Sequence, residues 1–233
     1  MTLDIGYFFE HPERFPIPDF LDGLSSPAEI LEKARAALDG ILASLGPSRA
    51  PDGGVSVYGS CHIGEGTVIY NGVTIIGPVY IGNNCEIMPC ATIRPYSIIG
   101  DGCKIGSGSE LKRAVLYGGA KVASLAFVGD SVLGASARVG SGVITANRRF
   151  DQAVVSVRLN GERRDLGSDF FGLILGDSSR LGANCVSQPG THIGPYTWVM
   201  PMTYVRGAIE REKRVYTKGE LVFDENIPVD LKP

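Results

Sequence analysis

An aliphatic residue recurs at every sixth position through the middle of the chain, and this period constrains the fold more than any other feature. The series is Val57, Ile63, Ile69, Ile75, Ile81, Ile87, Ile93, Ile99, Ile105 and Leu111, and Tyr117 breaks it. A small residue or a valine follows four positions after each member, from Cys61 to Val115. Glycine recurs in every third hexapeptide, at Gly64, Gly82, Gly100 and Gly118. Because short repeats of this kind stack into solenoids, three hexapeptides are expected to form one coil.

The two periodic positions predict an all-β fold, a triangular parallel β-helix. The aliphatic and small residues would point inward from short strands, and the glycines would sit at corners with backbone angles that a Cβ opposes. Four of the five cysteines, all except Cys90, occupy the small inward position, and none forms a CxxC pair. A buried thiol behaves as a small hydrophobe, so we expect packing rather than a disulfide framework or a metal site.

The repeat is interrupted, and interruptions are where function tends to lie. The pattern slips between Ala123 and Leu133, and residues 148–174 leave the coil as an insertion that reads as a β-hairpin around Asn160-Gly161. The insertion carries Arg148, Arg149, Arg158, Arg163 and Arg164. Two interpretations stay open: a solvated loop neutralised by nearby carboxylates, or an arm that reaches a neighbouring subunit or an anionic ligand.

Residues 26–46 predict one amphipathic helix. Ser26 is a candidate N-cap, Pro27 suits the first position, Glu29 completes a capping box and Gly46 ends the helix. Its apolar face is expected to cover the open end of the solenoid. The expected organisation is therefore an N-terminal arm and helix (1–50), a β-helix (55–210) with its insertion, and a C-terminal tail (211–233).

Charge and hydropathy exclude some classes of partner. The formal net charge is -3 and hydrophobic residues make up 44% of the chain, so nucleic acid is not expected as a partner. No apolar stretch approaches the roughly 18 residues of a membrane helix, and no signal peptide is evident, so a cytoplasmic protein without membrane contact is expected.

Two cations fall on the coil period. Arg94 and Lys112 each follow an inward aliphatic residue and are separated by three hexapeptides, so both should point outward from neighbouring strands about 4.8 Å apart. Like charges stacked in this way are unfavourable unless something compensates them. The pair therefore predicts a phosphate or carboxylate site, the alternative being a solvated surface or pairing with Glu110.

Four segments carry a family resemblance: AlaThrIleArgProTyr (91–96), GluLeuLysArg (110–113), LysValAlaSerLeuAlaPheValGlyAsp (121–130) and ValGlySerGlyValIleThrAlaAsn (139–147). They resemble the hexapeptide-repeat acyltransferases, and in particular the acetyltransferase domain of the bifunctional N-acetylglucosamine-1-phosphate uridyltransferase/glucosamine-1-phosphate acetyltransferases. The stretch from 147 through the hairpin is closer to the archaeal-type sugar-phosphate enzymes and to stand-alone nucleotidyltransferase-related proteins. The resemblance implies a left-handed β-helix, a homotrimer and acetyl-CoA or another acyl-CoA as co-substrate, with no tightly bound cofactor.

The resemblance also implies roles for single residues. Arg94 and Lys112 match the cations that hold the sugar phosphate, Asn147 matches an asparagine at the acceptor, and Ala146 is a candidate backbone contact for the thioester. Ser124 stands where the family has its catalytic histidine, and Phe127, at the substrate, stands where a tyrosine is usual. A hydroxyl cannot replace a general base near neutral pH.

A relocated base would have to come from another histidine. His62 and His192 both lie beside an inward aliphatic position. They are either ordinary solvent-facing or corner residues, or one of them is a base in a trimer cleft.

Two functions are therefore expected. One is acyl transfer from acyl-CoA to a small anionic sugar, an amino-sugar phosphate. The alternative is a non-catalytic trimeric protein that binds a sugar phosphate or nucleotide sugar, or regulates. Nucleotidyl transfer is not expected, because no glycine-rich nucleotide loop is present.

Overall fold

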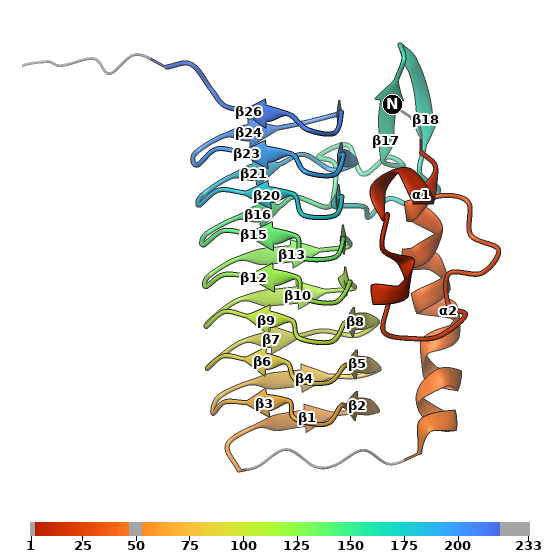
Figure 1. Ribbon diagram of the computed structural model, residues 1–233, viewed down its shortest axis with the longest axis vertical. Coiled ribbons are helices and arrows are strands. Elements are labelled where there is room, and N and C mark those ends of the chain that lie inside the picture. Colours follow the sequence, from red (N-terminus) through yellow and green to blue (C-terminus); the bar gives the residue numbers. More distant parts are fainter. Residues whose placement is uncertain (1–2, 47–52, 220–233) are drawn as a thin grey trace, which may run out of the picture.

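The computed structural model describes residues 3–46 and 53–219, and a parallel β-solenoid makes up most of it (Figure 1). Three eight-stranded sheets form its sides, and consecutive strands go to the three sheets in turn. The first sheet contains β1 (Ser56–Tyr58), β4 (Thr74–Ile76), β7 (Thr92–Ile93), β10 (Glu110–Lys112), β13 (Phe127–Gly129), β16 (Ile144–Thr145), β21 (Val186–Ser187) and β24 (Tyr204–Val205). The second contains β2 (Cys61–Ile63), β5 (Val79–Ile81), β8 (Ser97–Ile99), β11 (Val115–Leu116), β14 (Val132–Leu133), β19 (Leu173–Leu175), β22 (Thr191–Ile193) and β25 (Ala208–Ile209). The third contains β3 (Val68–Ile69), β6 (Glu86–Ile87), β9 (Lys104–Ile105), β12 (Lys121–Val122), β15 (Arg138–Val139), β20 (Arg180–Leu181), β23 (Trp198–Val199) and β26 (Arg214–Val215).

The predicted β-solenoid is confirmed, and so is the hairpin, whose strands β17 (Ser156–Leu159) and β18 (Glu162–Asp165) pair antiparallel. The periodic aliphatic residues from Ile75 to Leu111 are fully buried in one continuous core, together with Cys85, Cys103 and Cys185. Cys61 packs against that core and Cys90 is exposed. The solenoid also extends past residue 210, since β26 pairs with β23.

The repeat slips earlier than the sequence suggested. Thr92 pairs with Glu110, which lies three full hexapeptides further along the chain. Glu110 pairs with Phe127 and Phe127 with Ile144, and each of these steps is shorter than three hexapeptides by a single position. The coil therefore loses a residue at the corner after β10 and again after β13. The sequence pattern assigned Val115 to an inward position, but its side chain points outward. Ala114 takes the inward position instead.

The four glycines of the coil period have a different role from the one we predicted. None of them has a positive φ; that backbone conformation falls on residues such as Asn84 and Gly102 instead. A Cβ added to Gly100 would lie 2.7 Å from the backbone nitrogen of Gly118 and 2.8 Å from the carbonyl oxygen of Leu116. Glycine is therefore needed because the backbone of the next coil lies directly against it.

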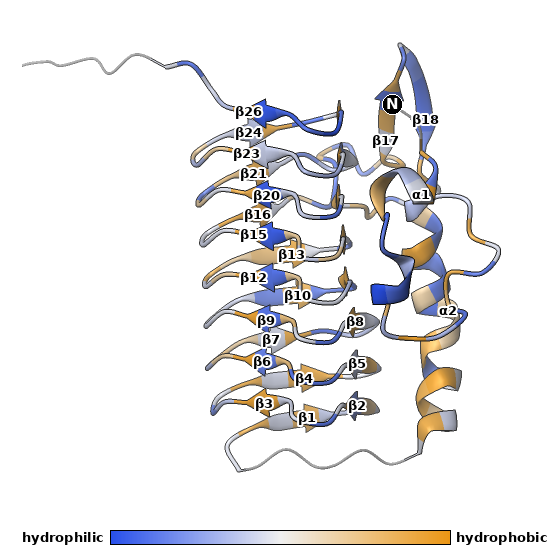
Figure 2. Ribbon diagram, viewed as in Figure 1, coloured by the Kyte–Doolittle hydropathy of each residue, from blue (hydrophilic) through white to orange (hydrophobic). Residues whose placement is uncertain are grey.

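The helix α2 (Pro27–Leu45) runs along the side of the solenoid, not across its open end as we expected (Figure 1). The outward residues of the second sheet form an apolar column that packs against the apolar face of the helix, and Figure 2 shows the apolar stretches of α2 beside the solenoid. The column contains Tyr80, Ile98, Val115, Val132 and Ile174. Burial of two apolar faces against each other stabilises this arrangement.

The start of α2 departs from the expected capping box. The Ser26 side chain caps no backbone N–H; instead, its hydroxyl donates to Glu29, whose carboxylate also accepts from the Ser25 backbone N–H at 2.8 Å. No helix of the described residues is both long and apolar enough to span a membrane.

The N-terminal arm, residues 3–25, covers the same column and contains α1 (Ile5–Phe8) and a 3-10 helix, η1 (Pro12–Arg14). Tyr117, which breaks the hexapeptide series, is fully buried beneath it and stacks on Phe9 with ring centroids 4.6 Å apart. The arm is held by Asp177, whose buried carboxylate accepts from the backbone N–H groups of Glu10 at 2.8 Å and Ala135 at 2.7 Å.

His192 lies under this arm, in the middle of a strand. The expectation of a solvent-facing or corner residue is therefore wrong for His192. It is fully buried in β22, and its ring is parallel to that of Phe171, with centroids 5.7 Å apart. Burial lowers the pKa of the imidazole to about 4. The ring is therefore neutral at physiological pH.

We predict that Gly100→Ala lowers the free energy of unfolding by about 1–3 kcal/mol, because the methyl group overpacks the contact between coils. Gly40→Ala is the control: a Cβ at this helical glycine meets no atom within 4 Å, and alanine favours the helix by roughly 0.5–1 kcal/mol. Urea denaturation measures both. Equal midpoints for Gly100→Ala and the parent protein would contradict this explanation of the repeat.

We also predict that protonation of His192 destabilises the fold. The unfolded imidazole takes up a proton near its ordinary pKa of 6.5, whereas the folded one does so at about 4. Stability is therefore complete above pH 6.5 and falls by about 3 kcal/mol as the pH drops from 6.5 to 4. His192→Phe should remove that part of the pH dependence in urea titrations. An unchanged pH profile in the variant would refute the assignment.

Candidate functional site

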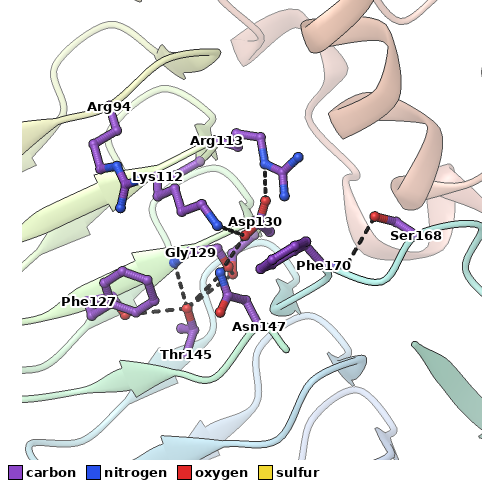
Figure 3. A network of polar contacts seen from close by, with 12 residues as sticks. Arg94, Lys112, Arg113, Phe127, Gly129, Asp130, Thr145, Asn147, Ser168 and Phe170 are labelled. Atoms are coloured by element: carbon purple, nitrogen blue, oxygen red, sulfur yellow. Dashed lines mark hydrogen bonds and ion pairs between the residues drawn. The ribbon is translucent and has the colours of Figure 1, made fainter. Parts of the chain in front are cut away.

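The irregular corners of the solenoid stack on one another along the same edge. The shortened corners after β10 and β13 and the insertion after β16 all lie between the first and the second sheet. Six side chains gather there, which we call the Asp130 cluster: Lys112, Arg113, Asp130, Asn147, Arg148 and Phe170. Figure 3 labels all of them except Arg148. The cluster thus contains residues from three successive coils and from the insertion.

Asp130 is the centre of the cluster, and its side chain is only 3% exposed. Lys112 Nζ lies 3.4 Å from its carboxylate, Arg113 Nε forms a second ion pair with it, and the Asn147 amide donates to it. A buried carboxylate requires such partners, because transfer of an unpaired charge out of water is costly. Asp130 is therefore the anchor on which the two cations and the Asn147 amide converge.

Phe170 brings the cations together. Its ring centroid lies 4.2 Å from Lys112 Nζ, 4.8 Å from the Arg148 guanidinium carbon and 5.4 Å from that of Arg113. The ring is positioned by its backbone N–H, which donates to Ser168 Oγ at 3.1 Å. Three cations with one carboxylate among them leave an excess of positive charge. Such a cluster can bind a phosphate or a carboxylate.

Arg94 and Lys112 lie side by side on neighbouring coils, as the coil period indicated. Each directly follows one member of the register pair Ile93 and Leu111. Each cation also has a carboxylate of its own: Arg94 Nη1 lies 2.8 Å from Glu110 Oε1, and Lys112 faces Asp130. For Arg94 this is the Glu110 pairing that we considered as the alternative. The pair as an anion site remains a prediction.

Phe127 and Asn147 meet above Gly129. A Cβ at Gly129 would lie 2.6 Å from Phe127 Cε1 and 2.7 Å from Asn147 Nδ2, so glycine makes the room that both side chains use. The Thr145 hydroxyl below accepts from the Gly129 N–H at 2.8 Å. Phe127 therefore adjoins the Asp130 cluster through Asn147, which belongs to it.

Ser124 lies at another corner, between β12 and β13, so the strand β13 separates it from Asp130. Its side chain is half-buried, and its backbone carbonyl accepts from Gly142 at 3.1 Å. His192 is buried beneath the arm, so it is not a base in a cleft, whereas His62 stacks on Tyr80 of β5, where burial lowers its pKa. A role for His62 as a base in a trimer cleft stays a prediction.

Ala146 borders a cavity of ≈ 610 Å³ on the outer side of the first sheet. Its backbone N–H donates to the Ser187 carbonyl at 3.0 Å, so the amide is already satisfied. Phe150, whose side chain is fully exposed, Arg149 and Tyr204 also line this cavity. It is large enough for part of an extended ligand.

Four of the five arginines of the insertion have side-chain partners and divide into two groups. Arg149, Arg163 and Arg164 pair with the neighbouring carboxylates of Asp151, Asp165 and Glu162. These three fit the solvated interpretation. Arg148 instead faces Phe170 and donates to Gln152.

A second group of cations forms a row on the outer face of the third sheet. Lys121 pairs in register with Arg138, and Arg138 with Arg180, and all three are exposed. We call Lys121, Arg138 and Arg180 the cation row; neighbouring members belong to strands about 4.8 Å apart. Lys104, next in register, is instead neutralised by Glu86 at 2.7 Å.

Sequence reasoning missed Arg113, Asp130, Phe170 and the cation row. Arg113 and Asp130 lie inside the motifs that carry the family resemblance, but no spacing argument applies to them because the corners that hold them are shortened. Phe170 lies in the insertion, where no repeat predicts its place. Within the described residues, no group of three or more histidine, cysteine or acidic side chains is arranged to hold a metal ion.

Comparisons with known proteins agree with the coil motifs. The family model of the GMPPB C-terminal domain matches residues 75–162. The bifunctional protein GlmU of Methanocaldococcus jannaschii is 29% identical over 119 residues, 51% of this chain and 29% of the relative. The bifunctional sugar-1-phosphate nucleotidylyltransferase/acetyltransferase of Sulfurisphaera tokodaii is 36% identical over 98 residues, 42% of this chain and 24% of the relative.

Among solved structures, a variant of the GDP-perosamine N-acetyl transferase from Caulobacter crescentus, in complex with CoA and GDP-perosamine, is 19% identical with a TM-score of 0.30. The match covers 80% of this chain and 64% of that one. The aligned part spans less than a third of the two curated relatives. Over this shared part, the hexapeptide coils of the chain are related to those of the GMPPB C-terminal domain and of the bifunctional GlmU and sugar-1-phosphate nucleotidylyltransferase/acetyltransferase proteins.

Proposed function

We propose that the protein transfers an acyl group from acyl-CoA to the amine of an amino-sugar phosphate. The observation that carries this proposal is the excess of positive charge at the Asp130 cluster, where Lys112, Arg113 and Arg148 surround one carboxylate. A bound phosphate would neutralise that excess through charge-assisted hydrogen bonds. The relatives support the chemistry, since one of them is named as a sugar-1-phosphate nucleotidylyltransferase/acetyltransferase.

The reaction forms one bond and breaks another. The free amine of the sugar attacks the thioester carbonyl carbon, the C–N bond of the amide forms, the C–S bond breaks, and the amine proton passes to solvent while the CoA thiolate is protonated. In this proposal Lys112, Arg113 and Arg94 orient the phosphate, and Asn147 and Phe127 contact the sugar. Orientation of both substrates is the main contribution of the site.

The donor has two candidate contacts. The cation row begins close to Ser124 in the sequence. Its member Lys121 lies on β12, and Ser124 lies at the corner that follows β12. Stacked like charges are unfavourable in the free protein, and the phosphates of acyl-CoA would compensate them. The acyl arm could then continue past Ser124 toward Phe127, with the cavity at Ala146 as the alternative path.

The absence of a base at Ser124 favours a second candidate function, a trimeric protein that binds a sugar phosphate or nucleotide sugar without turnover. General-base catalysis is typically worth about 10²–10⁴-fold, and the carboxylate of Asp130 is already engaged by Lys112, Arg113 and Asn147. Turnover separates the two functions. The homotrimer itself stays a prediction of the family resemblance.

We predict a crossed effect of two substitutions on thiol release, assayed with amino-sugar phosphates and acyl-CoA donors. Lys112→Met should raise KM for the acceptor about 10–100-fold, and Arg138→Met should raise KM for acyl-CoA by a similar factor, since each removes one charged hydrogen bond. Lys104→Met is the matched control, because Lys104 already pairs with Glu86. No turnover with any pair of substrates, together with binding of a sugar phosphate, would favour the non-catalytic function.

We predict that Ser124→His combined with Phe127→Tyr raises kcat by about 10²–10⁴-fold, because the pair restores a general base and the side chain that the related family has beside it. Ser124→Ala serves as the control and should leave kcat unchanged. The measurement is kcat against pH, in which the gain should follow deprotonation of the new imidazole. A loss of activity in the double variant with an intact fold would contradict the proposed place of the amine.

A further inference from the structure

The outer face of the first sheet changes from polar to apolar at the Asp130 cluster. One residue of each strand points outward in register with the next, and these residues form a single file along the sheet. On β1, β4, β7 and β10 the outward residues are Ser56, Thr74, Thr92 and Glu110. On β13, β16, β21 and β24 they are four apolar or aromatic residues, which we call the exposed column: Phe127, Ile144, Val186 and Tyr204.

The exposed column is open to solvent along most of its length. Ile144, Val186 and Tyr204 are 41%, 37% and 52% exposed, whereas the apolar column of the second sheet is buried under α2 and the arm. Contiguous apolar surface of this kind marks a binding site more often than scattered apolar residues do. Four side chains in single file expose less than the roughly 800 Å² that each partner of a stable protein interface buries. The column therefore fits a narrow ligand better than a second protein surface.

The far half of the exposed column borders the cavity at Ala146, whose volume is ≈ 610 Å³. Val186 and Tyr204 line this cavity, and so does Phe150 of the insertion, which is fully exposed. The volume falls within the roughly 300–1,000 Å³ of small-molecule sites. The column is thus hollowed where it leads away from the Asp130 cluster.

The charged residues of the cavity lining already have partners. Arg149 forms two hydrogen bonds with Asp151, and Arg148 donates to Gln152 at 2.9 Å. An anionic group in the cavity would compete with these contacts. An apolar chain would leave them intact and would remove the exposed column from water, which is favourable.

We propose that the exposed column binds an unbranched acyl chain, so that the donor is an acyl-CoA with a chain longer than acetyl. The column begins at Phe127, which lies beside Asn147 at the Asp130 cluster (Figure 3). From there it spans about 14 Å to Tyr204, because its four members lie on strands about 4.8 Å apart. The inference rests on the proposed function, since the thioester must lie near Phe127 for the chain to enter the column.

Binding of acyl-CoA donors to the full chain, without an acceptor, tests the inference. Calorimetry measures the affinity for acetyl-, butanoyl-, hexanoyl- and octanoyl-CoA. We expect the affinity to rise about 2- to 4-fold with each added methylene group, as the transfer of a methylene group out of water predicts. Equal affinity for all four donors would overturn the inference, and the proposed function would stand alone if acetyl-CoA is turned over. If none of the donors binds, both fail.

Two matched substitutions locate the chain on the protein. Val186→Asn should weaken octanoyl-CoA binding by about 10-fold, because it places an amide against the hydrocarbon. Val68→Asn is the control and should bind like the parent protein: Val68 is also an outward strand valine, 48% exposed, but it lies on the third sheet. Both side chains point away from the core, so the fold should be retained.

Two results of this comparison would overturn the inference. One is an equal loss of octanoyl-CoA affinity in both variants, which would mean non-specific binding of the chain. The other is a changed subunit number in Val186→Asn, measured by sedimentation velocity, together with an octanoyl-CoA affinity like that of the parent protein. The exposed column would then be a contact between copies of this chain.

Discussion

The contact of each coil with the next is the constraint on which the structure depends. Parallel strands must meet at about 4.8 Å over the whole length of the solenoid, where their backbone N–H and C=O groups pair. This leaves room inward only for one aliphatic and one small residue per strand, and for no side chain where corner backbones touch. Cys103 and Gly100 are both consequences of that packing, one inside the coil and one between two coils.

The same constraint confines variation to corners. A strand that lost or gained a residue would turn its inward side chains outward, whereas a corner can shorten or open without disturbing its neighbours. Three consecutive coils vary at one corner, after β10, β13 and β16. The charged residues of these corners gather around the buried carboxylate of Asp130 and form ion pairs with it. The Asp130 cluster therefore lies where the backbone of the solenoid is irregular, at the corners between the first and the second sheet.

The arm and α2 give one side of the solenoid a different character from the other two. They cover the apolar column of the second sheet and make His192 an interior residue, while the first and third sheets keep their outer faces in solvent. Figure 2 shows this contrast between the apolar helix and the polar strand ends of the third sheet. The burial of His192 and the exposure of the cation row both follow from this division.

The sequence by itself determined the solenoid, because a period of six with a glycine in every third repeat is compatible with few other ways of burying the aliphatic residues. It also determined the helix at 27–45 and the hairpin around Asn160-Gly161, whose signals are local. Only the tertiary structure decided which surface the helix covers, since the members of the apolar column lie one coil or more apart in the chain and become visible only in register. It also decided the composition of the Asp130 cluster: Phe170 comes from the insertion, and Arg113 and Asp130 from shortened corners, where periodicity no longer indicates which way a side chain points.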